Sequence, residues 1–339
     1  MKVLIIKTSS MGDIIHTLPA LTDAGNVLSS ATFDWVVEEN FIEIPKWHPL
    51  VNNVIPVALR RWRKNLFSSQ TLKQIRDFHQ EVSAEKYDLV IDAQGLLKSA
   101  LLACMTHGLR CGGDWNSARE HLASIFYQRK LNVPRQQHAI TRMRSLFAQA
   151  LGYTLPESVP NYGIDRAQFF QENTAENYLV FLHGTTWPTK HWPEEHWKSL
   201  AKLANQQGFL VKLPWGNLVE KERAERIAAS CDHAQVLPKL NLLGIAQELA
   251  GAKAVVSVDT GLGHLTAALD VPAVSLYGPT DPNLIGALGR SQKHLSATLV
   301  CQHCSQVHCA HEKSSTFQPS DMAILLPPVV WKEVLVIAY

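Results

Sequence analysis

The sequence predicts an α/β protein of two Rossmann-like, doubly wound domains that face a central cleft. In both halves of the chain, short runs of aliphatic and β-branched residues alternate with longer amphipathic segments, which is the order of a parallel sheet with helical crossovers. Residues 153–176 interrupt this alternation with proline, glycine and polar residues that keep no period. A chain of 339 residues is also long enough for two cores. We therefore expect an N-terminal domain over residues 1–160, a C-terminal domain over 161–320, and a final segment, 321–339, that packs back on the N-terminal domain.

The first half opens directly with a strand, and the alternation gives three more. The expected strands are residues 2–7, 33–38, 54–57 and 87–92. One helix is expected to start at residue 13, and two more are expected over residues 73–85 and 96–105. Asp13 follows the first strand, at the carboxyl end where open α/β sheets place their ligands, and Gln94 follows the fourth in the same way. The spacing Ser10-x-x-Asp13 also matches a capping box, so the acid can equally serve the helix start.

The second half repeats the pattern with five strands. They are residues 178–182, 209–213, 235–237, 255–258 and 273–277, and the helices cover 194–207, 219–230, 242–251 and 264–269. Beyond them, residues 321–339 resemble a strand or a short helix that Pro327-Pro328 interrupts.

The stretch around Asp259-Thr260-Gly261 organises the second half. A buried strand ends there, Gly261 and Gly263 permit a sharp turn, and a helix follows. This geometry points free backbone N–H groups and the positive helix end at an anion. Thr185, Thr186 and Lys190 leave another strand of the same sheet, so we expect them at the same edge as part of a diphosphate pocket.

Other interpretations of these residues remain open or are weaker. Aspartic proteases also use Asp-Thr-Gly but need two such triplets, and the chain has one. The dinucleotide fingerprint would need a small third residue where Thr266 stands, and Asp259 would face the pyrophosphate. The glycine-containing stretch can also be an ordinary strand–helix turn that needs glycine only for its backbone conformation. Lys190 can also be a surface lysine without a ligand.

Charge and hydropathy exclude several classes of protein. A net charge of +2 argues against a general nucleic-acid binder. The cations are concentrated instead in Arg60-Arg61-Trp62-Arg63-Lys64. Such a run is usually a solvated face, but Trp62 suggests a surface that meets an amphipathic partner. Because the chain opens directly with a strand, we expect no signal peptide. No apolar run approaches the ~20 residues that span a bilayer, so we expect a cytoplasmic protein with reduced cysteines.

Cysteines and histidines gather near the end of the chain. Cys301, Cys304 and Cys309 have histidines nearby, which invites a zinc interpretation. A second well-spaced pair is missing, so we expect no metal and no required cofactor.

Several motifs together resemble glycosyltransferase family 9, the heptosyltransferases, up to about residue 289. They are Lys7-Thr8-Ser9-Ser10-Met11-Gly12-Asp13, Phe33-Asp34-Trp35-Val36-Val37-Glu38-Glu39, Ile55-Pro56-Val57 with the basic run, Ile91-Asp92-Ala93-Gln94-Gly95-Leu96, Lys190-His191-Trp192-Pro193-Glu194-Glu195-His196-Trp197, Lys212-Leu213-Pro214-Trp215-Gly216, Ser257-Val258-Asp259-Thr260-Gly261 and Tyr277-Gly278-Pro279-Thr280-Asp281-Pro282. The resemblance implies a GT-B fold and inverting transfer of L-glycero-D-manno-heptose from ADP-heptose to Kdo-lipid A. It implies a monomer, with no nucleic-acid partner, on the cytoplasmic face of the inner membrane.

The resemblance also implies roles for individual residues. Asp13 would be the general base. The donor would contact Thr185, Thr186, Lys190, Glu220, Asp259, Thr260, Gly261 and His264. The acceptor would contact Ser10, Gly12, Arg60, Arg61, Arg63, Lys64, Gln94 and Arg119.

Two alternatives belong to related enzymes. The cysteine-rich tail is more like that of the family member that adds the second heptose, which remains a second hypothesis. Nucleotide-sugar epimerases of the same fold are a third, but they need no basic acceptor surface, so the cations at 60–64 argue against them.

Overall fold

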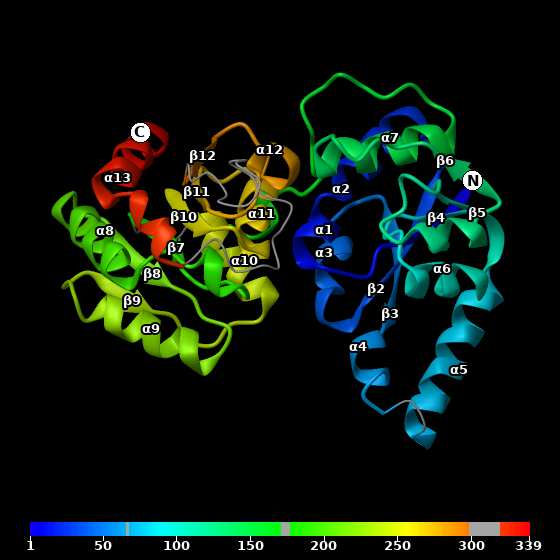
Figure 1. Ribbon diagram of the computed structural model, residues 1–339, viewed down its shortest axis with the longest axis horizontal. Coiled ribbons are helices and arrows are strands. Elements are labelled where there is room, and N and C mark those ends of the chain that lie inside the picture. The colour runs from blue at the N-terminus through cyan, green and yellow to red at the C-terminus, as the bar shows by residue number, and fades with distance from the viewer. Residues whose placement is uncertain (66–67, 171–176, 298–318) are drawn as a thin grey trace. The chain divides into compact units, whose positions relative to one another are not determined.

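The computed structural model describes residues 1–65, 68–170, 177–297 and 319–339. The chain divides into two compact units, Met1–Ile164 and Asp165–Tyr339, and each contains a six-stranded sheet (Figure 1). Every strand pair in both sheets is parallel, which confirms the predicted α/β class. In these described ranges, no helix is both long and apolar enough to cross a membrane.

The sheet of unit 1 has the strand order β3-β2-β1-β4-β5-β6. Its strands are β1 (Lys2–Ile6), β2 (Thr32–Glu38), β3 (Val51–Val57), β4 (Lys86–Asp92), β5 (His107–Gly113) and β6 (Arg129–Leu131). After β1 the chain adds β2 and β3 on one side of the sheet, and after β4 it adds β5 and β6 on the other side. The switch point between β1 and β4 is where doubly wound sheets place their ligands.

The helices of unit 1 cover its sheet. They are α1 (Met11–Ile15), α2 (Leu18–Val27), α3 (Glu43–Lys46), α4 (Leu59–Trp62), α5 (Ser69–Ala84), α6 (Leu97–Cys104) and α7 (Ala139–Leu151), with 3-10 turns η1 (Glu39–Phe41) and η2 (His121–Phe126). Phe78 of α5 and Leu102 of α6 pack with strand residues in one core, and α2 packs against α7.

The sheet of unit 2 has the order β12-β11-β10-β7-β8-β9, with its switch point between β7 and β10. Its strands are β7 (Tyr178–Leu182), β8 (Leu210–Leu213), β9 (Ala234–Val236), β10 (Ala254–Val258), β11 (Ala273–Tyr277) and β12 (Gln292–Ser296). The helices are α8 (Glu194–Gln206), α9 (Leu218–Ala228), α10 (Leu242–Gly251), α11 (Gly261–Ala268), α12 (Pro282–Ile285) and α13 (Pro327–Ala338), with 3-10 turns η3 (Arg166–Gln168), η4 (Pro188–Lys190) and η5 (Pro319–Ile324).

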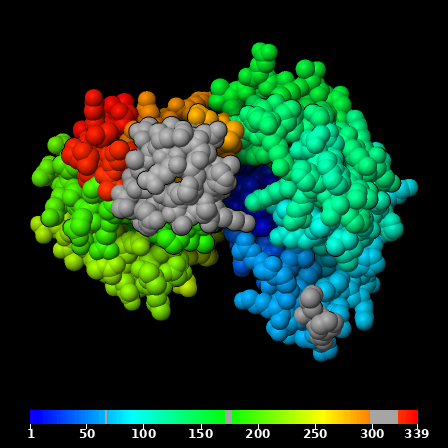
Figure 2. All heavy atoms as spheres, in the orientation of Figure 1, coloured from blue at the N-terminus to red at the C-terminus, as the bar shows by residue number. Residues whose placement is uncertain are grey.

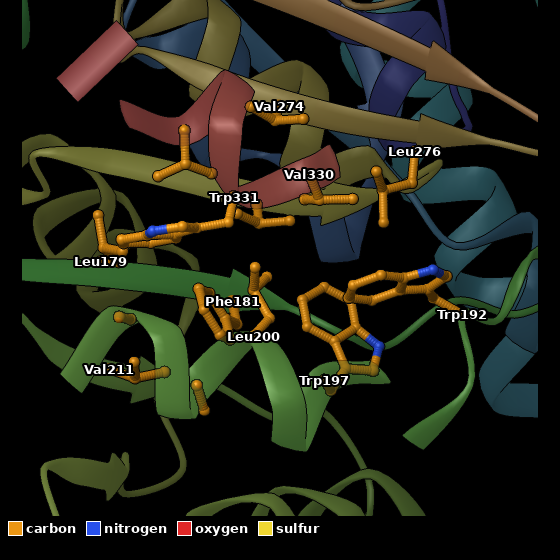
Figure 3. Close-up of a cluster of buried hydrophobic side chains, with 14 of the residues drawn as sticks. Leu179, Phe181, Trp192, Trp197, Leu200, Val211, Val274, Leu276, Val330 and Trp331 are labelled. Atoms are coloured by element: carbon orange, nitrogen blue, oxygen red, sulfur yellow. The ribbon is translucent and has the colours of Figure 1, made fainter. Parts of the chain in front are cut away.

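A tryptophan-rich core holds unit 2 together. Trp192 and Trp197 meet edge to face with their ring centroids 5.0 Å apart, and Trp331 of α13 lies over the same cluster (Figure 3). The indole N–H of Trp192 donates to the Leu325 carbonyl at 2.9 Å. Aromatic side chains contribute large buried areas, so this core fixes the loop after β7 together with the C-terminal helix.

The structure differs from the sequence-based prediction in several places, of which the following concern the C-terminal segment and the helix α11. Residues 321–339 were expected to pack on the N-terminal domain, but the buried face of α13 belongs to the core of unit 2. Pro327 and Pro328 do not interrupt this helix, because they occupy its first turn, where a missing N–H costs nothing. Gly263 lies inside α11 rather than in a turn before it, and a Cβ there would approach Ser257 Oγ to 2.8 Å.

Candidate functional site

Asp13 lies just beyond the switch point of unit 1, on the short helix α1 that follows β1. Its Oδ2 accepts hydrogen bonds from the backbone N–H of Ser10 at 2.9 Å and from the Ser10 hydroxyl at 2.8 Å. These two bonds are the contacts expected of a capping residue, and within the described residues no hydrogen bond to Oδ1 accompanies them. The carboxylate is therefore held in place by one oxygen and can present the other to a ligand.

Positive charges around Asp13 keep its carboxylate ionised. Burial by itself raises the pKa of Asp13, but the charges of Lys7 and Arg119 and the two bonds from Ser10 outweigh it, so the pKa lies below its ordinary value. Lys7 is 5% exposed, and its Nζ donates to the Ala93 carbonyl at 2.8 Å. A base must be unprotonated before it can accept a proton, and this arrangement provides that state at neutral pH.

Gln94 supports the loop that carries Asp13. Its Oε1 accepts from the backbone N–H groups of Thr8 at 3.0 Å and Ser9 at 3.1 Å. The loop of Gln94 is fixed in turn by Asp92, whose Oδ1 accepts from the N–H groups of Gln94 and Gly95 at 2.9 and 3.0 Å. The structure thus gives Gln94 a definite internal role beside the acceptor role that the resemblance implied.

Two cations near Asp13 were not selected from the sequence. Lys7 ends the first strand motif, and Arg142 lies on α7, a helix that the sequence analysis did not predict. Arg142 interacts electrostatically with Asp13, and its Nε is buried without a hydrogen-bond partner in the described part of the chain. An unsatisfied buried guanidinium nitrogen is costly, so an anionic ligand group beside it would be stabilised.

The side chains of the basic run, residues 60–64, differ in their burial. Trp62 is buried, donates to Gln74 Oε1 at 2.9 Å and packs in the core of unit 1, so the interpretation of Trp62 as part of an amphipathic surface is wrong. Arg61 forms a two-point ion pair with Glu39 at 3.1 and 2.9 Å. Arg60, Arg63 and Lys64 are exposed.

In unit 2 the N-terminus of α11 lies at the switch point between β7 and β10. Thr260 is extended, with φ −150° and ψ 158°, and the helix begins at Gly261. The first N–H groups of a helix have no partner within it and carry the positive end of its dipole. Thr260 and Gly261 therefore lie at the helix end where the sequence predicted an anion-binding backbone, and that binding role stays a prediction.

Asp259 contacts several side chains at the N-terminus of α11. Its Oδ2 lies 2.7 Å from Lys190 Nζ and accepts from the Thr280 hydroxyl at 2.7 Å, while its Oδ1 is 3.9 Å from His264 Nε2. Burial raises the pKa of Asp259, but Lys190, His264 and the hydroxyl of Thr280 together hold it below its ordinary value. Lys190 also lies over the ring of Trp187, 4.8 Å from its centroid.

The loop after β7 meets this cluster, as predicted. The Thr185 hydroxyl donates to the Asp259 carbonyl at 3.1 Å, and Thr186 is exposed beside it. Glu220 approaches from the first turn of α9: its Oε2 accepts from the N–H of Gly216 at 2.7 Å, and a Cβ on Gly184 would lie 2.8 Å from its Cδ. The structure brings these predicted donor residues to one edge of the second sheet.

Arg223 and His191 form a support that the sequence did not reveal. Arg223 Nη1 lies 2.6 Å from His191 Nδ1 and donates to the His183 carbonyl at 3.3 Å. Burial and the Arg223 charge lower the pKa of His191, and the same causes lower the pKa of His183 to about 4. Both imidazoles are thus neutral, and Arg223 ties the two ends of the loop together. Cys301, Cys304 and Cys309 lie outside the described residues.

Known proteins resemble this chain over most of its length. The model of glycosyltransferase family 9 (heptosyltransferase) matches residues 75–315. Lipopolysaccharide heptosyltransferase 1 of Pseudomonas aeruginosa is 56% identical over 322 residues, which are 95% of this chain and 89% of that protein. Two solved structures of the E. coli heptosyltransferase WaaC each cover 99% of both chains. The one with ADP has 48% identity and a TM-score of 0.89, and the one with ADP-2-deoxy-2-fluoro heptose has 47% and 0.86.

Proposed function

Because the chain belongs to glycosyltransferase family 9, the heptosyltransferases, we propose that it transfers L-glycero-D-manno-heptose from ADP-heptose to the Kdo residue of Kdo-lipid A. This reaction builds the inner core of lipopolysaccharide. The observation that carries the proposal is the pairing of two sites of different chemistry. Unit 1 holds a poised carboxylate among cations, and unit 2 holds a helix end beside Lys190.

The donor occupies the site of unit 2. The diphosphate of ADP-heptose accepts hydrogen bonds from the N–H groups of Thr260 and Gly261, and Lys190 with the hydroxyls of Thr185 and Thr186 completes its surroundings. As the bond to the anomeric carbon breaks, negative charge grows on the leaving phosphate, and these donors stabilise it.

Other residues of unit 2 orient the sugar and the nucleoside. Asp259 faces the heptose hydroxyls as an acceptor, with His264 supporting its carboxylate at 3.9 Å. Glu220 contacts the nucleoside from the first turn of α9. Lys190 is paired with Asp259 at 2.7 Å, which holds the ammonium near the place where the phosphates bind.

The acceptor occupies the site of unit 1. Asp13 Oδ1 takes the proton from the attacking Kdo hydroxyl while the hydroxyl oxygen bonds to the anomeric carbon, and ADP leaves from the opposite face, so the configuration inverts. Ser10 and Gly12 shape the loop around the base. Arg119 and Arg142 bind the carboxylate of the acceptor.

Further cations of unit 1 recognise the phosphates of lipid A. Arg60, Arg63 and Lys64 are exposed and can reach a lipid-borne anion, whereas the ion pair of Arg61 with Glu39 must open first. Because the acceptor is a lipid, the enzyme works as a peripheral protein on the cytoplasmic face of the inner membrane.

The test is release of ADP from ADP-heptose with three acceptor conditions. We expect release that depends on Kdo-lipid A and is negligible without an acceptor. Release only with a singly heptosylated core would instead identify the enzyme that adds the second heptose. Absence of release with either acceptor would overturn the proposal and favour a nucleotide-sugar epimerase.

A further inference from the structure

Unit 1 carries a group of large apolar side chains that face solvent between α6 and the end of η2. Leu101, Trp115, Leu122 and Ile125 are each between 50% and 62% exposed. A single exposed apolar side chain is ordinary, but several from neighbouring elements mark an interaction surface. We call these four side chains the apolar patch.

The members of the apolar patch belong to elements that pack on one another. Ala100 of α6 shares a small buried cluster with Ala123 of η2, so Leu101 lies next to that contact along the helix. Trp115 stacks on His121, the first residue of η2, with ring centroids 5.5 Å apart. The elements that carry the apolar patch thus pack on one another, and the residue-number colours of Figure 2 place this part of the chain among the turquoise atoms of unit 1.

The same part of the chain carries an excess of positive charge. Residues 97–130 include five lysines and arginines but two acids, whereas the net charge of the whole chain is +2. Lys98 and Arg119 are exposed, and one of the acids, Glu120, accepts from the N–H of Leu97 at 2.6 Å. Exposed apolar side chains beside cations complement a surface that offers hydrocarbon below anionic head groups.

The apolar patch also borders the acceptor site. Arg119 stands between Trp115 and η2 in sequence and interacts electrostatically with Asp13. The next residue, Glu120, donates its N–H to the Gly95 carbonyl at 2.9 Å, in the loop that Asp92 fixes. A surface that engages lipid here would bring a lipid-borne acceptor to the base.

We propose that the apolar patch inserts into the interface of an anionic phospholipid bilayer and holds the acceptor site against it. The occupant is the bilayer itself rather than the acyl chains of the acceptor. Trp115 suits the polar–apolar boundary because its ring is amphipathic, and the cations supply the second signal that stable peripheral binding requires. The choice of a lipid partner rests on the proposed function, but binding of the apolar patch to vesicles can be measured without any turnover.

The first experiment measures flotation of the full chain with vesicles that contain no Kdo-lipid A. Vesicles of phosphatidylcholine and phosphatidylglycerol should bind the protein, and the double variant Leu122→Ser/Ile125→Ser should bind at least about tenfold more weakly. The matched control is Val329→Ser/Val336→Ser on α13, whose side chains are 50% and 61% exposed, and it should bind like the unmodified protein. Equal binding of the two double variants would overturn the proposal.

A second measurement does not depend on how the double variant folds. Brominated lipids should quench part of the tryptophan fluorescence, and Trp115→Phe should remove that part. Quenching that is unchanged in Trp115→Phe would overturn insertion. Sedimentation that shows two copies of the chain joined through the apolar patch, with no dissociation of this dimer by vesicles, would overturn it as well.

Turnover separates this proposal from the proposed function. With a water-soluble Kdo acceptor, Leu122→Ser/Ile125→Ser should turn over like the unmodified protein, and with acceptor in vesicles it should lose activity in step with binding. Vesicle binding without turnover on any acceptor would contradict the proposed function and leave the lipid surface standing.

Discussion

Replacement of Lys190 by methionine tests the electrostatic design of the donor site. The Lys190–Asp259 pair is 2.7 Å long, and its side chains are 14% and 6% exposed. At that distance the Coulomb attraction is about 6 kcal/mol for an effective dielectric constant of about 20, and desolvation of both groups offsets part of it. Loss of one partner of a buried pair typically costs about 3–5 kcal/mol. Because Thr280 still donates to Asp259, we expect Lys190→Met to lose about 3 kcal/mol of unfolding free energy near pH 7.

The assay is urea unfolding followed by the fluorescence of the buried tryptophans of unit 2. Lys198→Met is the matched control, since Lys198 pairs with Glu194 and Glu195 on the surface of α8, where ion pairs contribute little. The double variant Lys190→Met/Asp259→Asn should regain most of the loss, because a neutral amide needs no counter-charge. A loss below about 1 kcal/mol in the single variant, or no recovery in the double variant, would refute the reasoning.

The pH dependence follows from the direction of the Asp259 shift. The folded-state pKa of this carboxyl lies below its ordinary value, so its contribution to stability is complete above the unfolded-state pKa of about 3.9 and disappears as the pH falls through the folded value. Without Lys190, burial dominates and raises the pKa of Asp259. In Lys190→Met, Asp259 should therefore take up a proton as the pH is lowered from 7 toward 5. The difference in unfolding free energy between this variant and the unmodified protein should shrink over the same range.

Two further predictions concern the acceptor site and the packing of α11. Lys7→Met removes a charge that lowers the pKa of Asp13, so the acid limb of the pH profile of kcat/KM should move to higher pH, and an unmoved limb would exclude Lys7 from this role. Gly263→Ala places a Cβ 2.8 Å from Ser257 Oγ and should cost about 1–3 kcal/mol in urea unfolding, a cost that Ser257→Ala relieves if the contact is its cause.

The sequence predicted those strands whose composition is strongly β-branched or aliphatic. β5 was missed because it contains Gly108, Gly112 and Gly113, which strands normally avoid. The structure shows why glycine is needed there: a Cβ on Gly108 would lie 2.7 Å from the Tyr87 carbonyl, and one on Gly112 would lie 2.3 Å from the Tyr127 ring. Close packing against neighbours, which the local sequence does not reveal, overrides strand propensity at these positions.

The positions of the candidate residues were predictable where they follow the carboxyl end of a strand. Asp259 directly follows β10, and Asp13 lies on the short helix that comes after β1; both were selected because the carboxyl ends of parallel strands share one edge of a sheet. Arg142 and Arg223 lie on helices and reach the sites only through tertiary packing, so local sequence carried no signal for them. Trp62 was misassigned for the same reason, since its core partner Phe78 lies on another helix.

The replacement Asp13→Asn tests the central claim most directly. The amide keeps the size of the side chain but cannot accept the proton, so turnover with Kdo-lipid A should fall by at least about 100-fold while ADP binds with unchanged affinity. Asp34→Asn is the control, because Asp34 is a buried carboxylate that accepts from Tyr87 near the amino end of β2, and it should retain turnover. Turnover by Asp13→Asn close to that of the unmodified enzyme would contradict the assignment of the base and, with it, the account of how the two sites act together.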